Sequence, residues 1–178
     1  MNILLTVLAV IGGIIVLLLI LALFVKKNFL VIRSIIINRP KAEIFDYVKY
    51  LRNQNDYSKW ALMDPDMQKS FTGTDAIPGF ISAWEGNKKV GKGEQEIKAI
   101  REGEKIDYEL RFEKPMRSVA QSYMATESVR TDKTKVTWAV GGKMKYPFNL
   151  MGLFMNMDKM MGTDLDIGLN NLKALKEK

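Results

Sequence analysis

The N-terminal part of the chain is an almost unbroken apolar run from Ile3 to Val25, and the first charged side chains are those of Lys26 and Lys27. As an α-helix rising about 1.5 Å per residue, the run reaches roughly 34 Å, enough to cross a hydrocarbon core of about 30 Å. A buried soluble helix would have a polar face, and a cleaved signal would have a shorter apolar core and a small-residue cleavage site. The sequence therefore predicts a membrane-spanning anchor.

The anchor is expected to occupy residues 1–27 and to precede one domain over residues 28–178. The positive charges that follow the run are those of Lys26, Lys27, Arg33, Arg39 and Lys41. Because positive flanks favour the cytoplasmic side, we expect a single-pass protein of the cell membrane with its domain in the cytoplasm. The link to the first predicted strand is so short that the domain must lie against the bilayer.

The composition excludes several kinds of site. The chain has no Cys and no His, so disulfides, thiol chemistry, zinc sites built on these residues and the commonest general base are absent. Its 27 Lys and Arg against 20 Asp and Glu give a net charge of +7. Beside an anchor, this balance favours attraction to an anionic leaflet over nucleic-acid binding, although a merely soluble surface would show it too. We expect no metal, no cofactor and no nucleic-acid partner.

Periodicity predicts one strand, a helical region and then an antiparallel meander. A strand is expected at 29–37, followed by a helix from Pro40 whose buried side carries Ile44, Phe45, Val48 and Leu51. Residues 52–66 are irregular and predict a short helix or a loop. Further strands are expected at 69–74, 80–86, 89–101, 104–113, 117–130 and 135–144, with one apolar and one polar face.

A long helix is expected at 148–175. One apolar stripe recurs at helical spacing through Leu150, Phe154, Met157, Met161, Leu165, Gly168, Leu172 and Leu175. The stripe should lie across the apolar face of the sheet, with Gly168 allowing close backbone approach. Met151, Met155 and Met160 thicken its first half, as in adaptable apolar pockets or in an ordinary core.

The stretches 84–94 (WEGNKKVGKGE), 134–138 (TKVTW) and 162–173 (GTDLDIGLNNLK) resemble the polyketide cyclase/dehydrase-like branch of the SRPBCC (START/Bet v 1-like) superfamily. The resemblance covers residues 29–176, and several bacterial members similarly carry an N-terminal membrane helix. It implies an α+β helix-grip fold, in which a curved antiparallel sheet wraps a long C-terminal helix around a deep apolar cavity. It names no ligand, because the superfamily includes lipid carriers, cyclases, oxygenase domains and hormone receptors.

The sequence assembles no catalytic centre. Glu94 and Glu96 share a strand face, as an acid/base pair requires, but Lys92 and Lys98 lie on that face too, which favours a solvated charge ladder. Asp64 and Asp66 flank a proline and read as a turn rather than a metal site. Tyr108 and Tyr123 carry hydroxyls that a ligand could use, and Tyr108 lies on the apolar face. No nucleophile, base and orienting group come together, so catalytic residues are not assigned.

The pattern favours a binding module that holds a hydrophobic or amphipathic small molecule, such as a lipid or isoprenoid from the adjoining leaflet. The expected cavity residues are Trp84, Ile97, Tyr108, Leu110, Phe112 and Trp138 on the sheet, and Met151, Phe154, Met155 and Met161 on the helix. Two alternatives stay open. One is a cyclase or dehydratase acting in the same cavity through Tyr108, and the other is a membrane-tethered scaffold whose cavity has collapsed.

Overall fold

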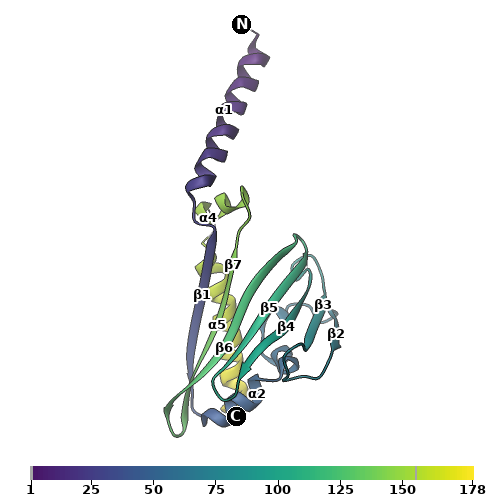
Figure 1. Cartoon of the computed structure of the whole chain (residues 1–178), viewed down its shortest axis with the longest axis vertical. Coiled ribbons are helices and arrows are strands. Elements are labelled where there is room, and N and C mark those ends of the chain that lie inside the picture. Colours follow the sequence, from purple (N-terminus) through teal and green to yellow (C-terminus); the bar gives the residue numbers. More distant parts are fainter. Residues whose placement is uncertain (1, 155) are drawn as a thin grey trace.

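The computed structural model describes residues 2–154 and 156–178. Helix α1 (Ile3–Phe24) projects away from a separate α+β domain (Figure 1). Within the described residues it is the one helix long and apolar enough to cross a membrane. Ala22 is its only buried residue, so nearly the whole apolar surface of α1 lies outside the protein.

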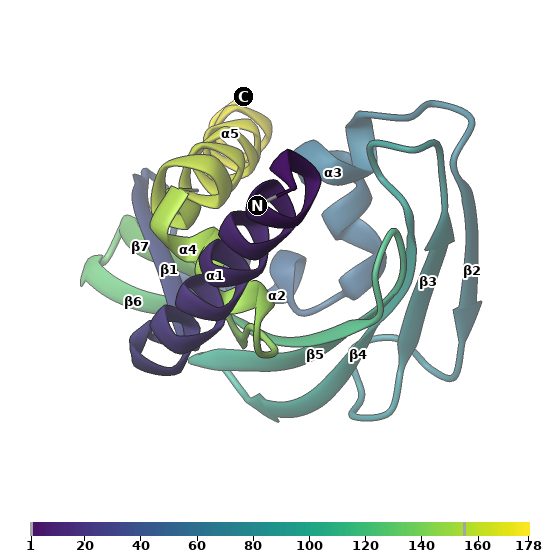
Figure 2. The same cartoon turned by 90° about the horizontal axis from the view of Figure 1, so that it is seen from above.

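The domain is built on one seven-stranded antiparallel sheet with the strand order β1-β7-β6-β5-β4-β3-β2. Its strands are β1 (Asn28–Ile37), β2 (Gln68–Thr72), β3 (Ile81–Glu85), β4 (Lys92–Arg101), β5 (Lys105–Lys114), β6 (Ser118–Arg130) and β7 (Lys133–Lys143). The sheet curves around the helices of the domain (Figure 2). The last strand pairs with the first, because Asn28 lies opposite Lys143 and Ile37 lies opposite Thr134.

The concave face of the sheet is covered by α2 (Lys41–Val48), η1 (Leu51–Asp56), α3 (Lys59–Leu62) and α5 (Met157–Lys176). The short helices η2 (Phe148–Leu150) and α4 (Met151–Phe154) lie beside the end of α1. The apolar side predicted for the helix that follows Pro40 is confirmed, since Ile44, Phe45 and Val48 of α2 and Leu51 of η1 are all buried. Alternation along β5 is confirmed as well, with Ile106 and Tyr108 in the core.

Helix α5 is fixed to the β1 and β7 side of the sheet. Arg33 of β1 reaches across to it, with Nη2 2.9 Å from Oδ2 of Asp158 and Nε 3.1 Å from Oδ2 of Asp166. This guanidinium lowers the pKa of Asp158, mainly through the hydrogen bond. At Gly168 the helix backbone approaches the ring of Trp138 so closely that a Cβ there would lie 2.7 Å from Cζ3. The close approach expected at Gly168 is therefore confirmed.

Two predicted boundaries are wrong. The expected helix over 148–175 is broken, because Asn156 caps a new helix by accepting a hydrogen bond from the Lys159 amide at 2.9 Å. The apolar residues that precede it instead form η2 and α4, beside the end of α1. Strand β4 begins at Lys92 rather than at residue 89, because Asn87 accepts from the Lys89 amide and Gly91 has a φ of +74°. These turns hold residues 86–91 as a loop.

Replacing Gly168 by alanine is expected to destabilise the domain. Overlap of the new Cβ with the buried Trp138 ring costs about 1–3 kcal/mol, against a helix-propensity gain of up to about 1 kcal/mol. Denaturant unfolding of the full chain would measure the difference. Gly152→Ala is the control, because the atom nearest to its Cβ is the flexible Met144 methyl at 3.1 Å. Equal stability of Gly168→Ala and wild type would contradict this account of the contact.

Candidate functional site

A cavity of about 380 Å³ lies between the concave face of the sheet and the helices. That volume falls within the range of small-molecule pockets, roughly 300–1,000 Å³. Helix α5 covers only the β1 and β7 side of the sheet, and the sheet continues past α5 to β3. The space that this leaves over the sheet is the cavity, which η1 and α3 close on the β3 side. Its lining combines the sheet residues Ser82, Trp84, Gln95, Leu110, Phe112, Ser122, Trp138 and Val140 with residues from the helices and loops.

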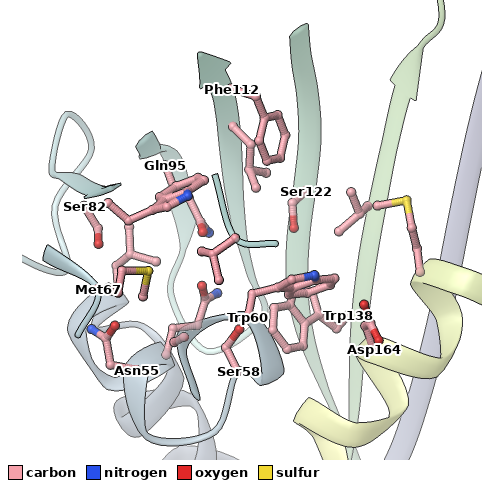
Figure 3. A pocket seen from close by; sticks show the side chains of 18 of the residues that line it. Asn55, Ser58, Trp60, Met67, Ser82, Gln95, Phe112, Ser122, Trp138 and Asp164 are labelled. Carbon is pink, nitrogen blue, oxygen red and sulfur yellow. The ribbon is translucent and has the colours of Figure 1, made fainter. Parts of the chain in front are cut away.

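Side chains from three parts of the fold converge on this space (Figure 3). Ser122 and Phe112 point in from the sheet, Ser58 and Trp60 come from the segment around α3, and Asp164 comes from α5. The walls are mostly aliphatic or aromatic. A molecule held here would therefore be bound chiefly through removal of apolar surface from water.

An aromatic cluster forms one wall. The ring centroids of Trp60 and Trp138 are 6.0 Å apart at an interplanar angle of 86°, and Tyr57 meets Trp138 edge-on at 5.9 Å. On the opposite side of the cavity, Trp84 and Phe112 meet edge-on at 5.9 Å. These edge-to-face contacts hold the rings in fixed orientations. The cavity walls are therefore largely preformed.

Two hydrogen-bond donors in the cavity wall lack partners. Nε2 of Gln54 and Nε1 of Trp138 are buried and have no acceptor among the residues that the structure describes. An unpaired buried donor costs about 1–3 kcal/mol, and an acceptor atom of a ligand would reach either donor after a small movement of the wall. Asp164, the one acidic or basic side chain in the described lining, is ion-paired with Lys59. The chemistry of the wall thus suits an uncharged molecule with an acceptor oxygen.

The structure brings together half of the residues predicted to line a cavity. Trp84, Leu110, Phe112, Trp138 and Met161 all contribute to its walls. Ile97 and Tyr108 are buried in the core rather than among the lining residues. Met151 and Phe154 are exposed near α1, because the predicted long helix is broken before α5. Met155 lies outside the described residues.

Sequence reasoning missed the wall made by the segment between α2 and β2. This wall consists of Leu51, Gln54, Asn55, Ser58, Trp60, Ala61 and Met67. The segment has no repeating apolar period, since it contains a 3-10 helix and a helix of only one turn. Trp60 was its one available signal, because a large aromatic residue in an otherwise polar stretch requires a place to pack.

Tyr108 does not supply a hydroxyl to the cavity. Its side chain is buried in the core, and its Oη finds no hydrogen-bond partner among the described residues. Burial raises the pKa of Tyr108 well above its usual range, with smaller contributions from Asp75 and Asp107. The phenol is therefore neutral at any physiological pH, and it does not line the cavity, although Tyr108 pairs with the lining residue Ser122 across the sheet.

Glu94 and Glu96 belong to an ion-pair cluster on the outer face of the sheet. Arg111 donates from Nε to Glu94 at 2.6 Å, and from Nη1 to Glu96 at 2.7 Å and to Glu109 at 2.6 Å. The hydrogen bond from Arg111 is the main cause of the lowered pKa of Glu96 and of Glu109. Both carboxylates are thus held ionised on the face opposite the cavity, which matches the charge ladder expected from the sequence.

Among the described residues, no group of three or more acidic side chains could hold a metal ion.

Comparison with solved structures identifies the architecture. Norcoclaurine synthase from Thalictrum flavum superposes with a TM-score of 0.65 at 7% identity, over 85% of this chain and 95% of its own. The di-domain ARO/CYC protein of the steffimycin biosynthetic pathway gives 0.61 at 10% identity, over 85% of this chain and 51% of its own. The domain has the helix-grip (START/Bet v 1-like) fold.

The helix-grip fold predicted by the resemblance is thereby confirmed. A protein from Nitrosospira multiformis is a further structural neighbour, with a TM-score of 0.60 at 18% identity over 83% of this chain and 96% of its own. No family model and no curated protein matches the chain. At these identities the likeness defines the helix-grip fold, and the ligand must be argued from the cavity itself.

Replacing Tyr108 by phenylalanine is expected to leave the domain as stable as wild type, or more stable by about 1 kcal/mol, because it removes an unpaired buried hydroxyl. Denaturant unfolding of the full chain would test this. Tyr57→Phe is the matched control, since the Tyr57 hydroxyl lies 3.2 Å from the Met124 sulfur and its removal loses a contact. A large loss of stability in Tyr108→Phe alone would show that its hydroxyl has a partner.

The Arg111 cluster predicts a pH-dependent contribution to stability. Carboxylates with a lowered pKa stabilise the folded state above their unfolded pKa, and this contribution is lost as the pH falls through the folded pKa. The stability difference between wild type and Arg111→Met should therefore be largest near neutral pH and shrink below pH 4.5, the ordinary value for glutamate. Unfolding titrations at several pH values would measure it, with Arg101→Met, at the exposed end of β4, as control. A difference that grows as the pH falls would contradict the assignment.

Proposed function

We propose that this protein is a membrane-anchored binding module that holds an uncharged, largely apolar small molecule in its helix-grip cavity. The observation that carries the proposal is the 380 Å³ space with apolar walls and two unpaired donors, Gln54 Nε2 and Trp138 Nε1. A lipid or isoprenoid-like molecule with a carbonyl, ether or hydroxyl oxygen has the matching chemistry.

The anchor supports a membrane source for the ligand. Helix α1 runs almost directly into β1, and the link is held to the domain by a hydrogen bond of 2.7 Å from the Met144 amide to the Lys27 carbonyl. The end of the sheet from which α1 leaves contains the start of β4 and the ends of β3 and β5, because Lys92 pairs with Glu85 on one side and with Lys114 on the other. Trp84 and Phe112 lie close to these strand ends. The cavity thus extends towards the anchored end. The positive charges that follow α1 favour a cytoplasmic domain.

The cavity also bears on the scaffold alternative. A scaffold whose cavity has collapsed would leave no space for a ligand, whereas this cavity has the volume of a small-molecule site. An apolar ligand that filled the cavity would gain roughly 25 cal/mol of binding free energy for each Å² of apolar surface removed from water. Useful affinity therefore needs no charged contact.

Filling the cavity should abolish ligand retention. The full chain would be extracted from its native membrane in lipid nanodiscs, and its co-purifying small molecules identified by mass spectrometry. Ser122 is buried in the cavity wall, so Ser122→Trp is expected to lose a molecule that wild type retains. Gln121→Trp is the matched control, because the neighbouring side chain is exposed on the opposite face of β6.

A more conservative variant keeps the proposal testable if Ser122→Trp does not fold. Trp138→Phe keeps an aromatic ring in the wall and removes one donor, so binding should weaken by about 0.5–1.5 kcal/mol, or about 2–10-fold. Unfolding temperatures of all variants would be compared first. A wild-type protein that carries only bulk membrane lipids, or a folded Ser122→Trp protein that keeps the molecule, would overturn the proposed function.

A further inference from the structure

The segment between β7 and α5 is attached to the end of the membrane helix. Asn149 is fully buried, and its Nδ2 donates to the Ala22 carbonyl at 2.6 Å and to the Val25 carbonyl at 3.0 Å. Carbonyls at a helix C-terminus lack partners within the helix, and in a membrane such groups must be satisfied by the protein. Asn149 therefore caps α1, and the segment carrying it is fixed beside the anchor.

The contact continues along α1. The Tyr146 hydroxyl lies 3.3 Å from the Leu19 carbonyl. At about 1.5 Å per residue, Leu19 precedes the end of the helix at Phe24 by about 7.5 Å. Residues 146–154, which we call the β7–α5 segment, thus lie against the C-terminal end of α1, where Figure 1 shows α4. If α1 spans the bilayer, the segment lies at the depth of the boundary between headgroups and acyl chains.

The side chains that this segment exposes suit that depth. It contains no charged residue, and Phe148 is 51% exposed, Leu153 60% and Phe154 81%. Exposed aromatic and leucine side chains next to one another are unfavourable in water but favourable in the interfacial layer of a membrane. A hollow between the segment and α1, lined by Leu21, Phe24 and Leu153 among others, would be open to acyl chains.

Basic residues surround the segment at the same end of the domain. By strand register, the loops that follow β3, β5 and β7 lie at the end of the sheet from which α1 leaves. Exposed Lys and Arg side chains on these loops and beside α1 are those of Lys26, Lys88, Lys89, Arg117, Lys143 and Lys145. Each such charge near an anionic leaflet contributes about 1 kcal/mol of attraction.

We propose that the β7–α5 segment is a second membrane-contacting element, which inserts Phe148, Leu153 and Phe154 into the interface of the anionic leaflet where α1 ends. The inference rests on one part of the proposed function, that α1 spans the bilayer. It does not depend on which ligand the cavity holds. Together, α1 and the segment hold the domain in one orientation. The surrounding loops then face the lipid headgroups.

Depth-dependent quenching in the full chain would test this inference. The chain has no Cys, so Leu153→Cys, Leu17→Cys and Val129→Cys each provide a unique site for an environment-sensitive fluorophore. The proteins would be placed in nanodiscs of phosphatidylcholine and phosphatidylglycerol, with nitroxide quenchers either near the headgroup or deep in the acyl chain. All three side chains are exposed, so the labels should not disturb the fold.

The label at Leu153 should be quenched most by the shallow nitroxide, at a depth of about 5–10 Å. The label at Leu17, about 10.5 Å before Phe24 along α1, should be quenched most by the deep one. The label at Val129, at the far end of β6, should be quenched by neither. Unfolding temperatures equal to wild type would confirm that each labelled chain is folded.

Two results would overturn the inference alone. In the first, Leu17 is quenched while Leu153 behaves like Val129, which leaves α1 in the membrane and the segment in water. In the second, the Leu153 label has a blue-shifted emission without lipid quenching, which would indicate a protein partner on the segment. Absence of quenching at Leu17 would overturn both this inference and the membrane anchoring in the proposed function.

Discussion

The packing of α5 against one side of the curved sheet decides what the rest of the domain can be. Arg33 holds the helix near its start through Asp158 and Asp166, and the missing side chain at Gly168 lets it approach Trp138. With the helix held over β1 and β7, the strands from β5 to β3 extend beyond its reach. The cavity is the space that remains between these strands, α5 and the η1–α3 segment.

The polar groups of the domain are divided between two faces of the sheet. On the outer face Arg111 bonds three glutamates and Lys98 bonds one of them, so opposite charges are paired there and stay in contact with water. On the inner face charge is almost absent, and the polar atoms that remain are mostly uncharged hydroxyl, amide and indole groups. Because an unpaired buried donor carries a penalty, the donors of Gln54 and Trp138 are the costly polar groups of this face.

Most of the fold could be predicted from the sequence because its signals are local. Strand alternation placed Ile106 and Tyr108 correctly on the apolar face of the sheet, and helical spacing placed Leu165 and Leu172 correctly on the buried stripe. The break before α5 could not be predicted, since the apolar period runs on through residues 148–154 and the contact that diverts them is made by α1. Only half of the predicted cavity residues line the cavity, because prediction depended on regular spacing of apolar residues. The alternation along the strands indicated which side chains face inwards, but the wall around Ser58 and Trp60 has no regular spacing of apolar residues.

The joint at Asn149 has a mechanical consequence. A domain tied to a projecting helix by one short peptide link can still tilt about that link. Here the chain is attached to α1 a second time, because Asn149 bonds the Ala22 and Val25 carbonyls from a segment more than a hundred residues away in the sequence. Two attachments on the same helix end remove that swivel. Any rotation or tilt of α1 is therefore transmitted both to β1 and to the strand paired with it, and so reaches the wall that contains Trp138.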